Sequence, residues 1–592
     1  MPTSFLRGAS LHYRVEAADL HAHLFRVTLT IAQPEVQQRV SLPVWIPGSY
    51  LIREFSKNLQ RLAARQQGRA VAVQQVDKSN WQVDCVPSSP LVLSYEVYAF
   101  DNSVRSAWLD TSRGFFNGTS LCLKVHGQES HVHALEIMGS RALGQWQVAV
   151  GLGAHKTNKR GFGTYLAADY DELVDCPVEL GTFWSADFKA AGIPHRLVVA
   201  GAAESFDGAR LLADTQKICE TEIRFWHDRK RPPFKNYLFM INVVDDGYGG
   251  LEHRNSTALI ASRRDLPRLG DNRVGDGYTT LLGLISHEYF HTWNVKRLRP
   301  AEFARYDYTR ENYTGLLWFF EGFTSYYDDL FLLRTGLIDT ARYLRLVARA
   351  VTGVLAMPGR KVQSLSQSSF DAWVKYYRAD ENTPNATISY YTKGALVALA
   401  LDLTLRAEGR GTLDDVMRAL WAASGGGPID EAQIAAVLQQ VGGRSYAGEL
   451  AAWVHGTDDL PLQRLLEAAG VDWRAVAATL AQRLGLRVSE SALTGVKVVN
   501  VLRGGAGELA GVSAGDEVLA IAGWRVRRLD DALRVLSAVQ SAPWLIARDQ
   551  RVLTLSVMLP TDTVLGAGAI ALNVAAAPAK AAAALRKAWL AV

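Results

Sequence analysis

Residues 287–291 read His-Glu-Tyr-Phe-His, and this segment constrains the fold of the chain more strongly than any other. Residues four apart lie on one face of an α-helix, so the imidazoles of His287 and His291 can reach one metal ion. Glu288 can then lie beside a water in an open position of that ion and accept its proton. The segment predicts a helix with two zinc ligands and a general base. The alternative is a surface helix that carries two histidines by chance.

The residues around this segment favour the metal site. Apolar residues precede it and Trp293 follows it. Such a helix is buried, and charged groups are rarely buried without a partner or an ion. Two histidines and a glutamate in a buried helix therefore predict a bound cation. The apolar residues ahead of the segment are Leu281, Leu282, Leu284 and Ile285.

A catalytic zinc ion usually takes three protein ligands and a water, so a third ligand is needed. Glu321 is the best candidate, because it is a lone acid in the aromatic segment 318–327, which also looks helical. The first helix is expected to end within residues 295–300, where cations suit its C-terminus and Pro300 stops it. Asp328, two helical turns after Glu321, could hold the free nitrogen of a ligand histidine, or it could be a solvated acid.

Residues 237–261 predict two strands joined by a turn, directly ahead of the metal helix. Residues 237–244 are apolar, the turn covers 245–250, and residues 251–261 can form the second strand. Such a pair can place an edge strand beside the ion, where free backbone groups align a peptide. Glu252 would then face the ammonium group of a substrate. Its alternative is an exposed acid at the start of a strand.

These motifs together resemble those of the gluzincin metallopeptidases, and in detail those of the glycyl aminopeptidase family with a C-terminal PDZ domain. The likeness rests on the segments at 287–300, 321–323, 391–394 and 43–50, and it spans nearly the whole chain. A further segment resembles the exopeptidase segment that this family carries upstream of the zinc helix. It consists of Gly249, Gly250, Leu251, Glu252 and His253.

The resemblance implies one Zn²⁺ ion held by His287, His291 and Glu321, with Glu288 as the general base. It implies that residues 249–253 bind peptide substrates with a free N-terminus, and that small N-terminal residues, glycine and alanine, are preferred. Tyr391 would be the donor to the oxyanion, a contribution whose loss costs about 2.7–4 kcal/mol. The adjacent Tyr390 could be the donor instead.

Composition is that of a large globular enzyme. A chain of 592 residues with 48% apolar and 21% charged residues provides several domain cores. A net charge of +5 without a basic block argues against a nucleic-acid partner. The four cysteines are far apart and lack zinc-ribbon spacing, so we expect buried free thiols. Residues 1–26 lack a signal-type apolar core and no apolar run of about 18 residues occurs, so we expect a cytoplasmic enzyme without a membrane segment.

The expected fold class is multidomain α+β. Residues 1–165 alternate apolar and polar positions and predict an N-terminal antiparallel β domain. Residues 166–345 predict a thermolysin-like zinc catalytic domain, with one helix near 208–226, and residues 346–482 a helical domain. A PDZ-like domain is expected over 483–562, followed by an Ala-rich tail over 563–592 in which residues 576–589 can form a closing helix.

Residues 498–521 carry the likeness to a PDZ domain, in the order strand, helical turn, Gly-Asp turn and strand. PDZ domains bind extended peptides by adding a strand to their own sheet, so an extended-peptide partner is one expectation here. The sequence at 484–487 matches the usual carboxylate-binding loop only in part. Packing or gating against the catalytic part is the equal alternative.

Two other functions fit the same sequence. The first is a zinc endopeptidase of the same fold that ignores the free amine of its substrate. The second is a non-catalytic PDZ-type binding protein. The intact set of ligands with Glu288 argues against the second, because a binding protein has no use for a general base.

Overall fold

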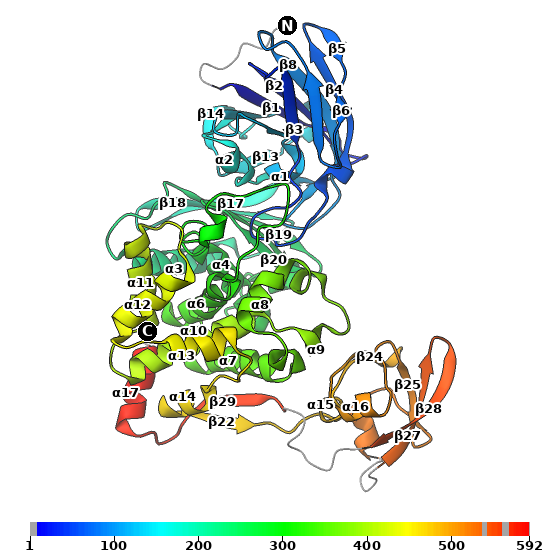
Figure 1. Cartoon of the computed structure of the whole chain (residues 1–592), viewed down its shortest axis with the longest axis vertical. Helices are drawn as coiled ribbons and strands as arrows, with labels where there is room; N and C mark the ends of the chain where they lie inside the picture. The colour runs from blue at the N-terminus through cyan, green and yellow to red at the C-terminus, as the bar shows by residue number, and fades with distance from the viewer. Residues whose placement is uncertain (1–8, 535–540, 559–567, 591–592) are drawn as a thin grey trace. The chain divides into compact units, whose positions relative to one another are not determined.

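The computed structural model describes residues 9–534, 541–558 and 568–590, and they form two compact units. Unit 1 is Met1–Asn312 and unit 2 is Tyr313–Val592. Unit 1 consists mainly of strands and unit 2 mainly of helices (Figure 1). The expected α+β class with an N-terminal β-rich domain and a helical region is therefore confirmed.

An eight-stranded sheet dominates the N-terminal part of unit 1. The alternation that predicts this sheet buries Leu11, Tyr13 and Val15 on one face of β1. All neighbouring strands are antiparallel except β1 and β12, which are parallel. That pair joins Leu11 to His133, and local alternation does not reveal pairings over such sequence distances. The order is β14 (Gly153–Thr157), β15 (Gly163–Ala167), β12 (His133–Ile137), β1 (Leu11–Asp19), β2 (Leu24–Ile31), β8 (Leu91–Tyr98), β4 (Leu59–Gln66) and β5 (Arg69–Val71).

Two four-stranded sheets complete this β-rich part and share its apolar core. The first has the order β13 (Gln147–Val150), β16 (Val178–Gly181), β10 (Arg113–Phe116) and β9 (Ala107–Leu109). The second has the order β11 (Lys124–Val125), β3 (Gln37–Ser41), β7 (Asn80–Asp84) and β6 (Gln74–Gln75). Short helices α1 (Gly118–Leu121) and α2 (Tyr170–Val174) lie in the same part of the chain.

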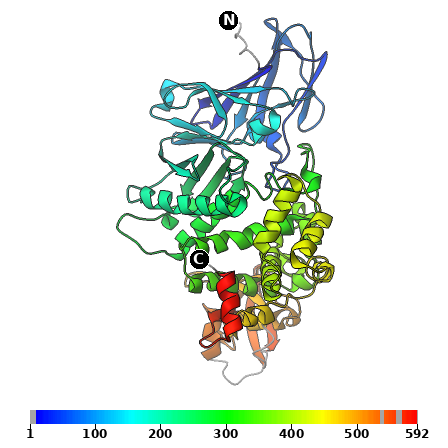
Figure 2. The same cartoon turned by 90° about the vertical axis from the view of Figure 1, so that its left-hand side faces the viewer.

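A mixed five-stranded sheet carries the rest of unit 1. Its order is β17 (Phe183–Ala190), β18 (Ile193–Ala200), β19 (Tyr237–Val244), β21 (Ser256–Ser262) and β20 (Tyr248–Glu252). The three inner strands are parallel, and the edge strands β17 and β20 run antiparallel to their neighbours. Helices α3 (Gly208–His227) and α4 (Asp276–Phe290) contact each other and the sheet, α3 at β17 and α4 at β20 and β21 (Figure 2).

The helical part of unit 2 is built around α10 (Tyr390–Ala407), most of whose residues are buried. Helix α10 contacts α5, α6, α7, α8, α11, α14 and α17. The other helices here are α5 (Leu317–Phe320), α6 (Gly322–Arg334), α7 (Thr340–Leu355), α8 (Leu365–Phe370), α9 (Thr383–Ala386), α11 (Leu413–Ser424), α12 (Glu431–Gly442), α13 (Ala447–Leu450) and α14 (Leu462–Ala468). Among the described residues, none of the helices has both the length and the apolar character that crossing a membrane requires.

A two-stranded ribbon connects the helices of unit 2 to a separate C-terminal body. Strand β22 (Val471–Ala475) pairs antiparallel with β29 (Ile570–Val574), so the chain leaves and returns through adjacent strands (Figure 1). The body between them has its own apolar core. Its elements are α15 (Leu480–Leu484), β23 (Leu486–Ser491), β24 (Gly495–Val501), α16 (Ala506–Leu509), β25 (Glu517–Ile521), β26 (Trp524–Arg525), β27 (Ser541–Arg548) and β28 (Arg551–Met558).

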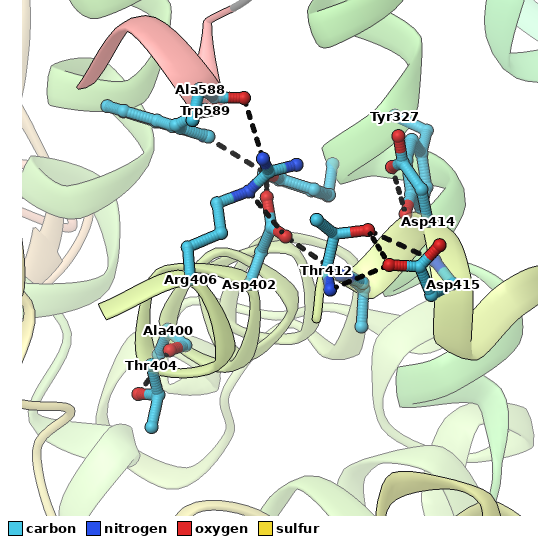
Figure 3. A network of polar contacts seen from close by, with 12 residues as sticks. Tyr327, Ala400, Asp402, Thr404, Arg406, Thr412, Asp414, Asp415, Ala588 and Trp589 are labelled. Atoms are coloured by element: carbon cyan, nitrogen blue, oxygen red, sulfur yellow. Dashed lines mark hydrogen bonds and ion pairs between the residues drawn. The ribbon is translucent and has the colours of Figure 1, made fainter. Parts of the chain in front are cut away.

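The chain then returns to the helices as α17 (Lys580–Trp589), close to the closing helix expected at 576–589. The indole of Trp589 is fully buried, and its Nε1–H donates to the hydroxyl of Tyr326 on α6 at 3.1 Å. That hydroxyl donates to Asp402, which also pairs with Arg406 at 2.9 Å. Arg406 in turn donates to the carbonyl of Ala588 at 2.6 Å (Figure 3). The last helix is therefore bonded to both α6 and α10.

All four cysteines are free. Cys122, Cys176 and Cys219 are buried as expected, whereas Cys85 is half-buried.

Candidate metal centre

Helix α4 positions the two histidines. His287 lies in its last turn, and His291 is its C-cap residue, with φ −60° and ψ −19°. Both residues keep helical geometry, so the spacing of four places the two rings on one side. Their Nε2 atoms lie 3.0 Å apart. Two nitrogens bound to one tetrahedral zinc ion at about 2.0–2.1 Å are about 3.3 Å apart, so the two imidazoles fit a shared ion.

The helix ends earlier than the sequence predicts, at Phe290 and not within residues 295–300. After His291 the backbone tightens, because the N–H groups of Thr292 and Trp293 bond carbonyls only three residues back, at 3.0 and 3.1 Å. Val295 in this turn has a φ of 118°, which β-branched residues rarely adopt. The cations and Pro300 thus follow the turn and do not cause it.

This turn also fixes the tautomer of His291. Its Nδ1 lies 2.8 Å from the backbone carbonyl oxygen of Asn294. A carbonyl can only accept, so Nδ1 carries the hydrogen and Nε2 keeps its lone pair for a ligand. The group that orients a ligand histidine is therefore a backbone carbonyl three residues later, which no side-chain motif reveals.

Glu321 lies where two helices meet. It is the C-cap of α5 and the N-cap of α6, and its side chain is buried. His287, His291 and Glu321 each offer a ligand atom, and these atoms lie within 4.8 Å of one another. Two imidazoles and one carboxylate are a ligand set that catalytic zinc sites use. The donor set and its spacing fit a zinc ion.

A pair of glycines explains why Tyr390 and Tyr391 come close to Glu321. A Cβ on Gly322 of α6 would lie 2.5 Å from the Cα of Gly394 on α10. Only glycine at both positions lets the two helix backbones approach so closely. The glycines that follow Glu321 and Lys393 are thus the two contact points at which helices α6 and α10 cross.

The two adjacent tyrosines differ in environment. Tyr390 is fully buried, and Tyr391 is half-buried. Burial raises the pKa of the Tyr391 phenol well above its ordinary value, and the charge of Glu321 raises this pKa further. The influence of Glu321 shows that the phenol of Tyr391 is near it. Tyr391 is therefore a neutral hydrogen-bond donor across the range of physiological pH.

The carboxylate of Glu288 lies against the backbone of β20. It is almost fully buried, and a Cβ on Gly250 would overlap it. Gly250 therefore allows the strand to approach the carboxylate that follows the first histidine. This contact explains physically why a glycine stands there in the segment 249–253.

Strand β20 is the edge strand expected beside the metal helix. The expected second strand is in fact two, because β20 ends at Glu252 and β21 begins at Ser256. Glu252 is buried, so the alternative of an exposed acid is wrong. A Cβ on Gly48, whose φ is 89°, would overlap the carboxylate of Glu252. The segment 43–50 thus makes room for this carboxylate through a glycine that has left-handed backbone geometry.

An ion pair supports the end of this strand. The ammonium of Lys296 lies 2.7 Å from Asp175, and Nδ1 of His253 lies 3.1 Å from the same carboxylate. Burial alone would raise the pKa of Asp175, but Lys296 and His253 outweigh it and hold this pKa well below its ordinary range. Burial alone would lower the pKa of Lys296, but Asp175 reverses this and raises it. Asp175 lies outside the sequence motifs, and Lys296 lies within the segment 287–300, where no local pattern indicates its partner.

The remaining predicted residues take less central places. Leu251 belongs to the apolar core of the β-rich part. Asp328 is half-buried on α6 and accepts from the backbone N–H of Asp329 at 2.5 Å. Its role beside a ligand histidine stays a prediction.

Two family models match the chain. The model described as the Peptidase M61 N-terminal domain matches residues 12–182, and the one described as M61 glycyl aminopeptidase matches residues 280–397. The second range includes His287, Glu288, His291, Glu321 and Tyr391. A search among curated proteins finds no match.

Solved structures extend this likeness to the whole chain. The crystal structure of an aminopeptidase N family protein from Idiomarina loihiensis is 37% identical, with a TM-score of 0.92 over 98% of this chain and 100% of that chain. An M1 zinc metallopeptidase from Deinococcus radiodurans is 16% identical, over 78% of this chain and 97% of that chain, with a TM-score of 0.46. Legionella pneumophila aminopeptidase A is 12% identical, over 76% of this chain and 50% of that chain, with a TM-score of 0.48. TM-scores below 0.5 carry no conclusion, so only the first of these bears on the family.

Proposed function

Because the chain belongs to the M61 glycyl aminopeptidase family of peptidases, we propose that it is a zinc-dependent aminopeptidase of the gluzincin type. It would hydrolyse the first peptide bond of peptides with a free N-terminus and favour small N-terminal residues, glycine and alanine. The observation that carries the proposal is the spacing of the ligand atoms of His287, His291 and Glu321, together with a carboxylate at Glu288.

His287, His291 and Glu321 would hold one zinc ion. The tautomer of His291, set by the carbonyl of Asn294, places the lone pair on Nε2, the atom that would bind the ion. Zinc bound there would lower the pKa of a water molecule to about 7 and polarise the carbonyl of the scissile bond. This is the chemistry that the chain's own side chains cannot supply.

Glu288 would act as the general base and then as the acid. Its carboxylate accepts a proton from the attacking water and passes it to the nitrogen of the leaving amine. Its burial against Gly250 holds the carboxylate beside the edge of β20, where the scissile bond of an aligned peptide would lie.

Tyr391 would donate a hydrogen bond to the carbonyl oxygen as negative charge develops on it. The raised pKa of Tyr391 supports this role, because the phenol stays protonated at the pH of turnover. Tyr390 is fully buried, which favours Tyr391 as the donor.

Glu252 would bind the ammonium group of the substrate. It is the last residue of the edge strand β20, and Gly48 leaves room for its buried carboxylate. A buried carboxylate binds a cation far better than a neutral acetylated end, so a free N-terminus is selected.

Glu288→Gln tests the proposal. We expect the variant to keep one zinc ion per chain, measured by elemental analysis, and to lose hydrolysis of a glycyl peptide. Cleavage by the variant at the wild-type rate would show that Glu288 is not the general base. If the wild-type protein binds no zinc after loading, the assignment of the metal centre is contradicted.

A matched pair of peptides separates the aminopeptidase from the endopeptidase. The first has a free N-terminus, and the second is the same peptide with an acetylated N-terminus. We expect cleavage of the first only, because Glu252 gains nothing from a neutral end. Equal cleavage of both would favour the endopeptidase.

The assignment of the C-terminal body as a PDZ-type domain is part of the same proposal. Its strand β23 lies at the edge of the sheet and offers backbone groups to an extended peptide. A cytoplasmic location likewise stays a prediction.

A further inference from the structure

Arg105 reaches the open edge of β20 from the loop between β8 and β9. Its Nη2 donates to the carbonyl oxygen of Gly250 at 3.3 Å, and it is half-buried. Its Nε–H is buried and has no acceptor among the described residues. None of the described carboxylates forms an ion pair with it. A cation placed against a substrate-binding strand without a counter-charge is the kind of group that binds an anionic ligand.

The hydrogen-bond pattern shows which side of β20 this cation occupies. The N–H of His253 donates to the carbonyl of Ser256 at 3.0 Å, which makes 253 and 256 a hydrogen-bonded pair. Such pairs alternate along an antiparallel ladder. The backbone groups of Gly250 and Glu252 therefore point away from β21, toward the open edge. Arg105 lies on this open edge, because it bonds the outward carbonyl of Gly250.

Two opposite charges thus stand at strand positions whose backbone groups face the open edge. Glu252 supplies a carboxylate at one end, and Arg105 supplies a guanidinium at Gly250, two residues away. Two residues of an antiparallel strand span about 6.8 Å, which is also the length of an extended dipeptide. A peptide with its ammonium at Glu252 and its chain antiparallel to β20 would carry its second residue to Arg105. Its first peptide bond would then lie beside Glu288, which packs on Gly250.

We propose that Arg105 binds the C-terminal carboxylate of a dipeptide, so that the preferred substrates are dipeptides with a small N-terminal residue. This inference rests on the proposed aminopeptidase function and names its substrate class. The planar guanidinium suits a carboxylate, because it can donate two parallel hydrogen bonds. A longer peptide places a neutral peptide group at the same position and therefore forms no ion pair with Arg105.

A binding experiment tests the inference apart from catalysis. The zinc-loaded Glu288→Gln variant is titrated calorimetrically with Gly-Gly and with Gly-Gly-amide, which differ only in the terminal carboxylate. We expect Gly-Gly to bind about 10- to 100-fold more tightly than the amide, the usual range for charge-assisted hydrogen bonds. Adding Arg105→Gln should reduce this ratio to about one. Arg105→Lys should leave an intermediate ratio, because the charge remains and the fork geometry is lost.

Arg61→Gln is the matched control, since this arginine is 77% exposed and pairs with Glu96. It should leave the ratio of the two affinities unchanged. The inference is overturned if the acid and the amide bind equally to the Glu288→Gln variant, or if Arg105→Gln weakens both ligands by the same factor. If Arg105→Gln does not fold, the ratio measured with Arg105 intact still decides the matter.

Turnover separates this inference from the proposed function. Wild-type enzyme should hydrolyse Gly-Gly with a lower KM than Gly-Gly-amide and with a similar kcat. Loss of hydrolysis of both substrates in zinc-loaded wild-type protein contradicts the aminopeptidase. Equal KM values for the two contradict the role of Arg105 alone.

Discussion

At the scale of single residues, glycine explains much of the candidate site. Gly250 admits the carboxylate of Glu288, Gly48 admits that of Glu252, and Gly322 and Gly394 let two helices touch. In each case a residue with a proposed role in catalysis or binding lies against a neighbour that has no side chain. The motifs that contain these acids and tyrosines therefore also contain the glycines at which two backbone segments, or a backbone and a carboxylate, come close together.

Tyr391→Phe should lower kcat by about 100- to 1,000-fold, the usual effect of removing one donor to an oxyanion. Tyr390→Phe should lower kcat far less, because Tyr390 is fully buried. Steady-state kinetics on a glycyl peptide measures both. Burial keeps the pKa of Tyr391 above its ordinary value, so this phenol should cause no loss of activity between about pH 6 and 9. If Tyr390→Phe lowers kcat more than Tyr391→Phe does, Tyr390 is the donor to the oxyanion.

At the scale of elements, sequence patterns predict what is local and miss what is distant. The strand at 237–244, the helix at 208–227 and the metal helix follow from their own residues. The end of α4 does not, because it depends on the tightened turn at residues 292–293 and on the left-handed backbone of Val295. The parallel pairing of β1 with β12 and the pairing of β22 with β29 cannot be predicted either, because strands far apart in sequence leave no local signal of their pairing.

The candidate site shows the same division. His287, Glu288 and His291 follow from one short motif, and Glu321 follows from its aromatic surroundings. Arg105, Asp175 and Lys296 could not be assigned, because each acts on a partner that is distant in sequence. Tertiary contacts of this kind become visible only when the chain is folded.

Helix α17 belongs to the element scale as well, because one indole anchors it. Trp589→Ala should lower the free energy of unfolding by about 3–5 kcal/mol, through loss of a fully buried indole and of its bond to Tyr326. Trp524→Ala is the control, since Trp524 is 64% exposed and should change stability by less than about 0.5 kcal/mol. Urea unfolding followed by circular dichroism measures both. Equal stability of the two variants would mean that α17 does not support α6.

At the scale of the whole molecule, the buried pair of Asp175 and Lys296 links stability to pH. The pKa of Asp175 is lowered on folding, so its contribution is present above the unfolded value of about 3.9 and is lost as the pH falls further. The pKa of Lys296 is raised, so its contribution is lost only at alkaline pH, above about 10.4. The pair therefore stabilises the fold across the neutral range and weakens in acid.

Asp175→Asn should lower the free energy of unfolding by about 3–5 kcal/mol at pH 7, because Lys296 is left buried without its partner. The difference from wild type should shrink at pH 3. Urea unfolding at the two pH values checks this, with Asp472→Asn as the control. Asp472 pairs with Arg474 in an exposed ion pair and should change stability by less than about 1 kcal/mol. An equal deficit of Asp175→Asn at both pH values would contradict the linkage.

The ribbon of β22 and β29 has a consequence for the order in which this protein is completed. Domains generally fold as they leave the ribosome, the N-terminal ones first. The C-terminal body between the two strands emerges before α17, yet the bonds from Trp589 to Tyr326 and from Arg406 to Ala588 belong to helices synthesised much earlier. The nascent helical part therefore stays incomplete until α17 has been made, and a ribosome that stalls within the body leaves the surface around Tyr326 uncovered.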